Sequence, residues 1–296
     1  MTLIGIILAL IAERLLSQLR EWREHAWYAR YLDWLDQRSK LPWLWHSAWG
    51  LLLLIAAPVA AVALIQALLH GGVITLLGLL FGVLVLVFCL GPRDLAEEIH
   101  SYLDAQAAGD HGESERIAAD LSRLPPGAVS TGSEECRGVV RGVLIQGHER
   151  LLAVLFWFYL LGPMGAVLYR LSATLPGLLQ QRDVSDNLRE VALRLHAILA
   201  WLPVRLSAAL YTLAGSTDDA LQAWRAQTGD EGDWSAQSWR LLARVGCGAM
   251  QMEDSADQPV KLEPEDALIE ALALVRRALL LGLGVLAAFT IGGWLT

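Results

Sequence analysis

Two arginines stand out in the sequence because each follows an apolar stretch that contains a helix-breaking residue. Arg170 closes the run LLAVLFWFYLLGPMGAVLYR, and Arg205 follows Pro203 in the motif WLPVRL. The planar guanidinium group of arginine can hold a phosphate or a carboxylate through two parallel hydrogen bonds. The same long side chain can instead extend along apolar surface and place its charge among lipid headgroups. The residue types support these two roles about equally.

Three further polar residues are candidates for ligand binding. Glu13 and Arg14 directly follow an apolar run, where they form either a polar pair inside a helical bundle or an ion pair at the membrane surface. His100 lies in the helical segment IHSYLD, where it is either a ligand-binding residue or an ordinary surface or packing residue. His196 is open to the same two interpretations. Since no neighbouring residues complete a metal-binding set, we predict no metal site and no catalytic residues.

The common portable active-site motifs are absent from the sequence. It contains no Walker A loop, no H-E-x-x-H, no G-x-S-x-G and no G-x-G-x-x-G. The three cysteines, Cys89, Cys136 and Cys247, are scattered and indicate neither a disulfide framework nor a zinc site. The formal net charge of −8 argues against a nucleic-acid partner. The acidic stretches at 218–219 and 230–233 lack the spacing of an EF-hand loop and are typical of solvated loops.

The composition is that of a membrane protein. Hydrophobic residues make up 55% of the 296-residue chain and charged residues only 18%, below the roughly 25% that is typical of soluble domains. The mean hydropathy is +0.42, and several apolar stretches approach or exceed the ~20 residues needed to cross a bilayer as a helix. We therefore predict an all-α integral membrane helical bundle with four or five spans, plus amphipathic and cytoplasmic helices.

The apolar stretches predict the order of the spans. Residues 43–69 and 73–90 form an antiparallel hairpin, and further spans are expected at 151–171 and 278–295. Residues 186–215 form either another span or a half-buried helix around Pro203, and the positive-inside rule favours another span. Basic residues before the first span place the N-terminus in the cytoplasm.

Polar stretches between the spans show helical periodicity and complete the predicted organisation. Short helices are expected at 94–110, 114–124, 134–146, 218–227 and 235–245. The predicted segments are N-terminal membrane-surface helices (1–42), a transmembrane hairpin (43–91), a polar helical insert (92–149), a membrane region that holds both arginines (150–215), a polar acidic helical insert (216–275) and a C-terminal transmembrane helix (276–296).

The motifs around the two arginines resemble those of a known family, the CobD/CbiB adenosylcobinamide-phosphate synthases of cobalamin biosynthesis. That family shows the pattern G-x-P-G-A-x-x-Y-R-x-x-N-T-L-D followed by N-W-[LI]-P-A-R-L. The first pattern is matched at Gly165, Ala166, Tyr169, Arg170, Thr174 and Leu175, and the second at Trp201, Pro203, Arg205 and Leu206. Tyr169 and Trp201 therefore join Arg170 and Arg205 as candidate ligand-binding residues.

Three positions depart from this pattern. The family's asparagine and aspartate in the first motif fall on Ala173 and Pro176, and the asparagine before the tryptophan falls on Ala200. These changes remove polar groups that could bind a metal or a nucleotide phosphate, while residues that shape the backbone remain. The resemblance therefore implies a scaffold without its chemistry.

The AmpE branch of this family is a closer resemblance, and it extends over nearly the whole chain. Five segments of this chain resemble segments of that branch: ERLL (13–16), IHSYLDA (99–105), LFWFYLLGPMG (155–165), WLPVRL (201–206) and DDALQAW (218–224). This resemblance implies a multi-pass protein of the bacterial inner membrane that regulates β-lactamase induction. It also implies a link to AmpD, the soluble amidase of peptidoglycan recycling.

The sequence thus supports three readings. The first is a non-catalytic regulator embedded in the lipid bilayer that holds a muropeptide, a nucleotide or a lipid phosphate near Arg170 and Arg205. The second is an active ATP-dependent synthase of the CobD/CbiB type, in which other carboxylates replace the lost polar groups. The third is a structural partner that docks a soluble enzyme through the polar insert at 93–149, which carries more acidic than basic residues.

Overall fold

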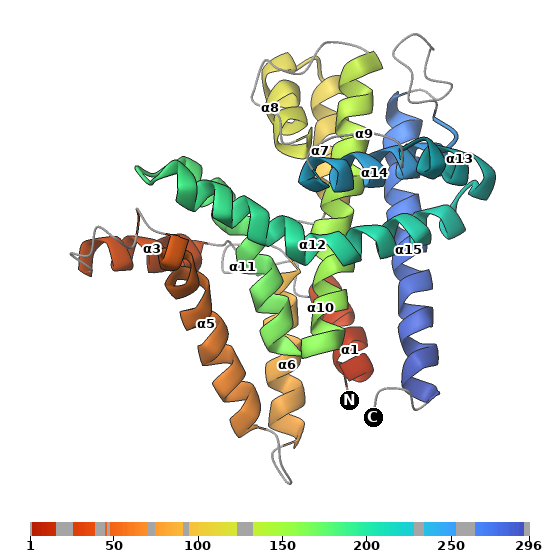
Figure 1. The fold of residues 1–296 in the computed structure, drawn as a ribbon. Helices are drawn as coiled ribbons and strands as arrows, with labels where there is room; N and C mark the ends of the chain where they lie inside the picture. Colours follow the sequence, from red (N-terminus) through yellow and green to blue (C-terminus); the bar gives the residue numbers. More distant parts are fainter. Residues whose placement is uncertain are drawn as a thin grey trace. The chain divides into compact units, whose positions relative to one another are not determined.

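The computed structural model describes residues 2–15, 26–38, 45, 48–69, 75–90, 95–122, 133–227, 234–252 and 264–292. All regular structure within these residues is helical (Figure 1). The predicted all-α class is therefore confirmed. The short helices expected in the polar stretches are also present, as α7 (Leu95–Ala107), α8 (His111–Ser122), α9 (Ser133–Gly147), α13 (Thr217–Gln227) and α14 (Trp234–Ala249).

The chain divides into two compact units that interleave along the sequence. The first unit comprises residues 1–92 and 153–200, and the second comprises residues 93–152 and 201–296. Helix α12 (Asp186–Ala214) contributes its first half to the first unit and its second half to the second. Each unit is described by itself below.

In the first unit, one helix supports the two arms of the predicted hairpin. Helix α11 packs against both α5 and α6, while α1 packs against α6. Pro58 lies inside α5, where it removes one backbone hydrogen bond. The bounds of these helices are α1 (Thr2–Leu15), α3 (Ala26–Arg38), α5 (Ala48–Leu68), α6 (Thr75–Cys89), α10 (Ala153–Leu161) and α11 (Pro163–Gln180).

The single span expected at 151–171 is wrong, because the chain breaks at Gly162. Helix α10 ends at Leu161, and α11 starts at Pro163 and turns back alongside α10 (Figure 1). Gly162 adopts a φ of 71°, a left-handed conformation that favours glycine. Pro163 occupies the first helical position, where its missing N–H is not needed. Arg170 therefore lies on a returning helix.

A glutamine from another helix fixes this turn. The Nε2 of Gln66 donates a hydrogen bond to the Leu161 carbonyl at 3.2 Å, and its Oε1 accepts one from the Met164 backbone N–H at 3.1 Å. The same side-chain amide thus satisfies backbone groups on both sides of the break. This matters in a membrane region, where an unsatisfied backbone group costs several kcal/mol.

The second unit is organised around α9, which packs against α8, α14 and α15 (Pro264–Ile291). A short π-helix, η3 (His148–Leu152), follows α9 without a break. Gly147 lets α15 approach closely, because a Cβ at this position would lie 2.7 Å from a methyl group of Val275. Helix α15 begins at Pro264, well before the last span predicted at 278–295. One face of its first half is buried in this unit, at Ala267, Leu268, Ala271, Leu274 and Val275.

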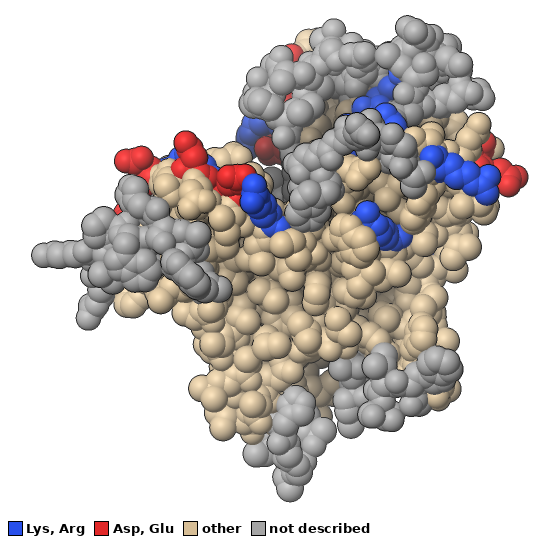
Figure 2. Space-filling view, in the orientation of Figure 1, with Lys and Arg blue, Asp and Glu red and all other residues tan. Residues whose placement is uncertain are grey.

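The helices have the lengths and surfaces of a multi-pass membrane protein. Within the described residues, three continuous helical stretches are long and apolar enough to span a bilayer: Cys136–Leu161, Asp186–Ala214 and Glu265–Ile291. Two shorter apolar helical stretches, Leu53–Leu68 and Leu76–Cys89, accompany them. Large apolar side chains are exposed on these helices, and the face in Figure 2 has a broad surface of uncharged residues. Such a surface is suited to contact with lipid.

Candidate functional site

An apolar cavity in the first unit, lined in part by Arg170, is the candidate binding site. The cavity has a volume of about 340 Å³ and lies between α5, α6 and α11. This volume falls in the range of about 300–1,000 Å³ that is usual for small-molecule sites. Its wall is almost entirely apolar. The lining residues are Pro58, Ala61, Val62, Leu84, Val85, Phe88, Cys89, Val167, Arg170 and Leu171.

The position of Arg170 is compatible with both roles considered for it above, namely binding an anion and placing its charge among lipid headgroups. Arg170 is half-buried and is the one charged residue among those that line the cavity. Because the wall exposes almost no polar surface, the aliphatic stem of Arg170 forms this part of the wall, and its guanidinium does not face into the cavity. Arg170 shares the wall with Cys89, the last residue of α6. Its aliphatic stem can cover apolar surface while its charge meets a polar headgroup. One side chain can thus both snorkel and bind an anion.

Tyr169 supports α11 from a different direction and is not among the residues that line the cavity. It is fully buried, and its ring centroid lies 5.5 Å from that of His196 on α12. Ser172 donates a hydrogen bond to the Tyr169 carbonyl at 2.7 Å, and its Oγ lies 3.4 Å from Nδ1 of His196. Because the hydroxyl proton of Ser172 is used, the Nδ1 of His196 is the donor in this second contact. These contacts join α11 to α12.

Arg205 and Trp201 form a stack on the surface of α12. The guanidinium carbon of Arg205 lies 4.0 Å from the Trp201 ring centroid, and Nη1 donates a hydrogen bond to the Trp201 carbonyl at 3.0 Å. Trp201 is 45% exposed, as are the neighbouring Leu202 and Leu206 to a similar degree. This arrangement is typical of an aromatic and cationic anchor at a membrane interface. Arg205 belongs to the second unit and Arg170 to the first.

Of the remaining predicted site residues, only His100 has a described side chain, and it is not among the residues that line the cavity. His100 is exposed on α7, beside the buried residues Ile99 and Tyr102. Glu13 and Arg14 are part of α1, but their side chains lie outside the described residues. In the part of the chain that the structure describes, no group of three or more His, Cys, Asp or Glu residues could hold a metal ion.

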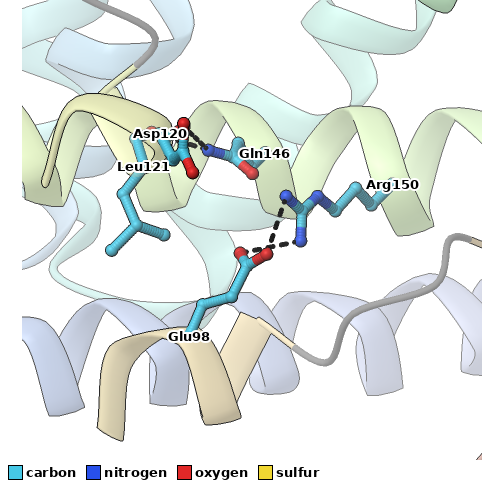
Figure 3. A network of polar contacts seen from close by, with 5 residues as sticks. All are labelled: Glu98, Asp120, Leu121, Gln146 and Arg150. Atoms are coloured by element: carbon cyan, nitrogen blue, oxygen red, sulfur yellow. Dashed lines mark hydrogen bonds and ion pairs between the residues drawn. The ribbon is translucent and has the colours of Figure 1, made fainter. Parts of the chain in front are cut away.

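A half-buried ion pair in the second unit was not predicted from the sequence. The Nη1 of Arg150 donates to Oε2 of Glu98 at 2.9 Å, and Nη2 donates to Oε1 at 3.4 Å (Figure 3). The Nε2 of Gln146 donates to the carbonyls of Asp120 and Leu121, at 3.0 and 2.6 Å, near the end of α8. These contacts tie η3 to α7 and α9 to α8.

Two buried polar residues of the π-helix were also missed. His148 is fully buried, and its Nδ1 lies 2.8 Å from Oγ of Ser207 on α12. The ring of Trp239 packs against His148, with 5.8 Å between the ring centroids. Glu149 is only 2% exposed. A π-helix often marks a functional position, but in the sequence GHER reads simply as the polar boundary of an apolar run.

A polar cavity of about 270 Å³ lies elsewhere in the first unit. Its lining residues are Asp36, Trp45, Arg182, Asp183 and Val184. Arg182 forms an ion pair with Asp33 and lies 5.7 Å from the centroid of the Trp45 ring. This cavity could not be predicted from the sequence, because its walls come from three stretches that are separate in the chain.

Comparison with known proteins relates the whole chain to a regulatory family. A family model described as regulatory signalling modulator protein AmpE matches residues 1–296. A protein AmpE of Shigella flexneri is 27% identical over 303 aligned residues, which cover 99% of both chains. A cobalamin biosynthesis protein CobD of Stutzerimonas stutzeri (strain A1501) is 31% identical over 259 residues, which cover 83% of this chain and 80% of that protein. No solved structure matches significantly.

Proposed function

Because the chain belongs to the AmpE family and is related to CobD proteins, we propose that it is a regulatory protein of the bacterial inner membrane. In this proposal it links the state of cell-wall recycling to β-lactamase induction and does not itself catalyse a reaction. Its N-terminus lies in the cytoplasm, where the basic residues before the first span are favoured. A soluble peptidoglycan-recycling amidase, AmpD, is the candidate partner.

The observation that carries this proposal is the placement of Arg170 beside the apolar cavity, whose wall it forms with its aliphatic stem. A guanidinium group can bind a phosphate-bearing ligand through two parallel hydrogen bonds. The cavity is formed by α5, α6 and α11, so a ligand that fills it favours one packing of these three helices over any other. Ligand binding can therefore change how these helices pack. Such a change can transmit a signal in a membrane regulator.

The positions that depart from the synthase pattern support a regulatory role. Ala173 and Pro176 lie on α11, and Ala200 is buried on α12. None of these side chains can bind magnesium or hold a nucleotide phosphate by a charge, as phosphoryl transfer from ATP requires. Helix α11 thus keeps the arginine that recognises an anion and lacks the polar groups of the synthase motif.

We expect that replacing Arg170 by alanine abolishes the regulatory phenotype. The measurement is β-lactamase activity after exposure to a β-lactam, in a host with an inducible enzyme whose own copy of this gene is deleted. The deletion strain carries either the wild-type chain or the variant. The phenotype is lost because alanine cannot bind an anion, while the membrane level of the protein stays the same on an immunoblot.

Arg194→Ala is the matched control for this experiment. Arg194 lies on α12 in an exposed ion pair with Glu190, and such pairs contribute little to stability. Induction should therefore remain normal in this variant. Normal induction in the Arg170→Ala strain, at equal protein level, would contradict the proposed role of the cavity.

A second function, ATP-dependent amide ligation of the CobD/CbiB type, is favoured by one observation. The CobD protein of Stutzerimonas stutzeri is as much as 31% identical to this chain over most of both lengths. In this alternative, carboxylates elsewhere in the chain replace the polar groups that are missing at Ala173 and Pro176. The two functions make opposite predictions for a ligation assay, which is treated in the Discussion.

A further inference from the structure

We propose that the cavity between α5, α6 and α11 holds the hydrocarbon chain of a membrane lipid whose anionic phosphate headgroup binds Arg170. This inference rests on the proposed function and deepens it, because it names the chemical class of the ligand. A water-soluble nucleotide is the less suitable occupant. Its base and sugar carry hydrogen-bonding groups that an almost entirely apolar wall would leave unsatisfied, at considerable cost.

The sequence of α5 accounts for the shape of this cavity. Pro58 interrupts the backbone hydrogen bonding of the helix. One turn later, Ala61 and Val62 place small side chains on the cavity wall. On the opposite side, Leu84, Val85 and Phe88 of α6 provide larger apolar surfaces. The result is a slot with apolar walls, which suits a flexible hydrocarbon chain.

The setting of the cavity explains how a lipid reaches it. Ala61 and Leu84 line the cavity and are also exposed on the surface of the unit, so the slot is open on one side. The adjoining surfaces of α5 and α6 carry exposed leucines, such as Leu64 and Leu80, which face lipid in a membrane. A lipid chain can therefore enter sideways from the bilayer without crossing water.

The charge of Arg170 suits the headgroup of a lipid. Arg170 lines the same cavity as Cys89, the last residue of α6, and the apolar run in the sequence ends directly after this helix, at Gly-Pro-Arg (91–93). A lipid chain that occupies the slot would place its phosphate at this end. The guanidinium is a donor for phosphate oxygens, and its attraction is stronger where water is partly excluded.

The test is native mass spectrometry of the full-length protein, purified in detergent and stripped of endogenous lipid. It is supplied with phosphatidylglycerol or with phosphatidylcholine of the same acyl chains. We expect one phosphatidylglycerol to be retained, with an apparent affinity about tenfold above that of phosphatidylcholine. Millimolar inorganic phosphate should not displace the phosphatidylglycerol, because the hydrocarbon chain of the lipid also contributes to binding.

Two pairs of variants locate the lipid. Arg170→Gln should bind phosphatidylglycerol about tenfold more weakly than the wild type, whereas Arg194→Gln should bind it normally. Ala61→Trp fills the slot and should abolish retention. Ala60→Trp is its control, since Ala60 is exposed on α5 and does not line the cavity. Because Ala61→Trp leaves Arg170 in place, it tests the binding site for the hydrocarbon chain of the lipid even if Arg170→Gln fails to fold.

Three results would overturn the inference: equal retention of both lipids, retention in the Ala61→Trp protein, or displacement by inorganic phosphate. These outcomes are distinct from failure of the proposed function. Lipid binding as expected, combined with normal induction in the Arg170→Ala strain, would leave the lipid site in place and remove its regulatory role. Loss of induction in the Arg170→Ala strain without selective lipid binding would support the regulatory role of Arg170 and contradict the lipid site.

Discussion

The Gly165→Ala protein should be much less stable than the wild type. A Cβ at this position would lie 2.3 Å from the Trp157 carbonyl oxygen and 2.7 Å from the Leu161 Cβ. Both atoms belong to α10, and one is backbone, so the methyl group fits only if α10 and α11 move apart. Overpacking of this kind typically costs about 1–3 kcal/mol and sometimes more. The midpoint of thermal unfolding in detergent should fall accordingly.

Gly177→Ala provides the control on the same helix. A Cβ there meets no atom within 4 Å, and alanine favours a helix over glycine by about 1 kcal/mol. The midpoint should therefore stay the same or rise. If both substitutions lowered the midpoint equally, the close approach of α10 and α11 at Gly165 would be contradicted. Because α11 carries Arg170, the Gly165→Ala protein should also lose ligand selectivity at the cavity.

Replacing Arg150 by methionine should destabilise the second unit strongly. The side chains of Arg150 and Glu98 are only 20% and 15% exposed. Removing the cation leaves the carboxylate of Glu98 in a setting with little water, and loss of one partner of a buried pair costs about 3–5 kcal/mol. Since some solvent reaches both groups, we expect the lower end of this range. Thermal unfolding in detergent is again the measurement.

Two comparisons isolate the pair from a general effect of mutation. The double variant with Glu98→Leu should recover most of the lost stability, because both partners of the pair are then removed together. Arg116→Met removes the cation of an exposed pair with Glu113, whose side chains are 68% and 47% exposed, and should change little. If the double variant is as unstable as Arg150→Met alone, the loss of the Arg150 guanidinium from the carboxylate of Glu98 is not the cause.

Much of the fold follows from local sequence patterns. Apolar length and 3.6-residue periodicity are properties of a segment by itself, so the all-α class and the short helices of the polar stretches could be predicted. The span expected at 151–171 was wrong for a physical reason. Hydropathy averages over Gly162 and Pro163, whereas the direction of the chain depends on the φ of that one glycine.

The candidate site was predictable only in part. Arg170 could be singled out because its residue type is unusual at the end of an apolar run. Its cavity could not, because the walls come from α5, α6 and α11, which are distant in the chain. Arg205 shares the same sequence pattern, yet its guanidinium stacks on Trp201. The two environments differ through packing, which the local pattern does not contain.

The most direct test of the central claim, that this chain regulates and does not ligate, is an amide-ligation assay on the purified protein. The assay supplies ATP, Mg²⁺, the corrinoid acid and aminopropanol phosphate, and runs beside an active CobD protein. No product above background is expected, because Ala173 and Pro176 replace the polar groups of the synthase motif. Product formation at a rate comparable to that of the CobD protein would contradict it and establish the chain as a synthase.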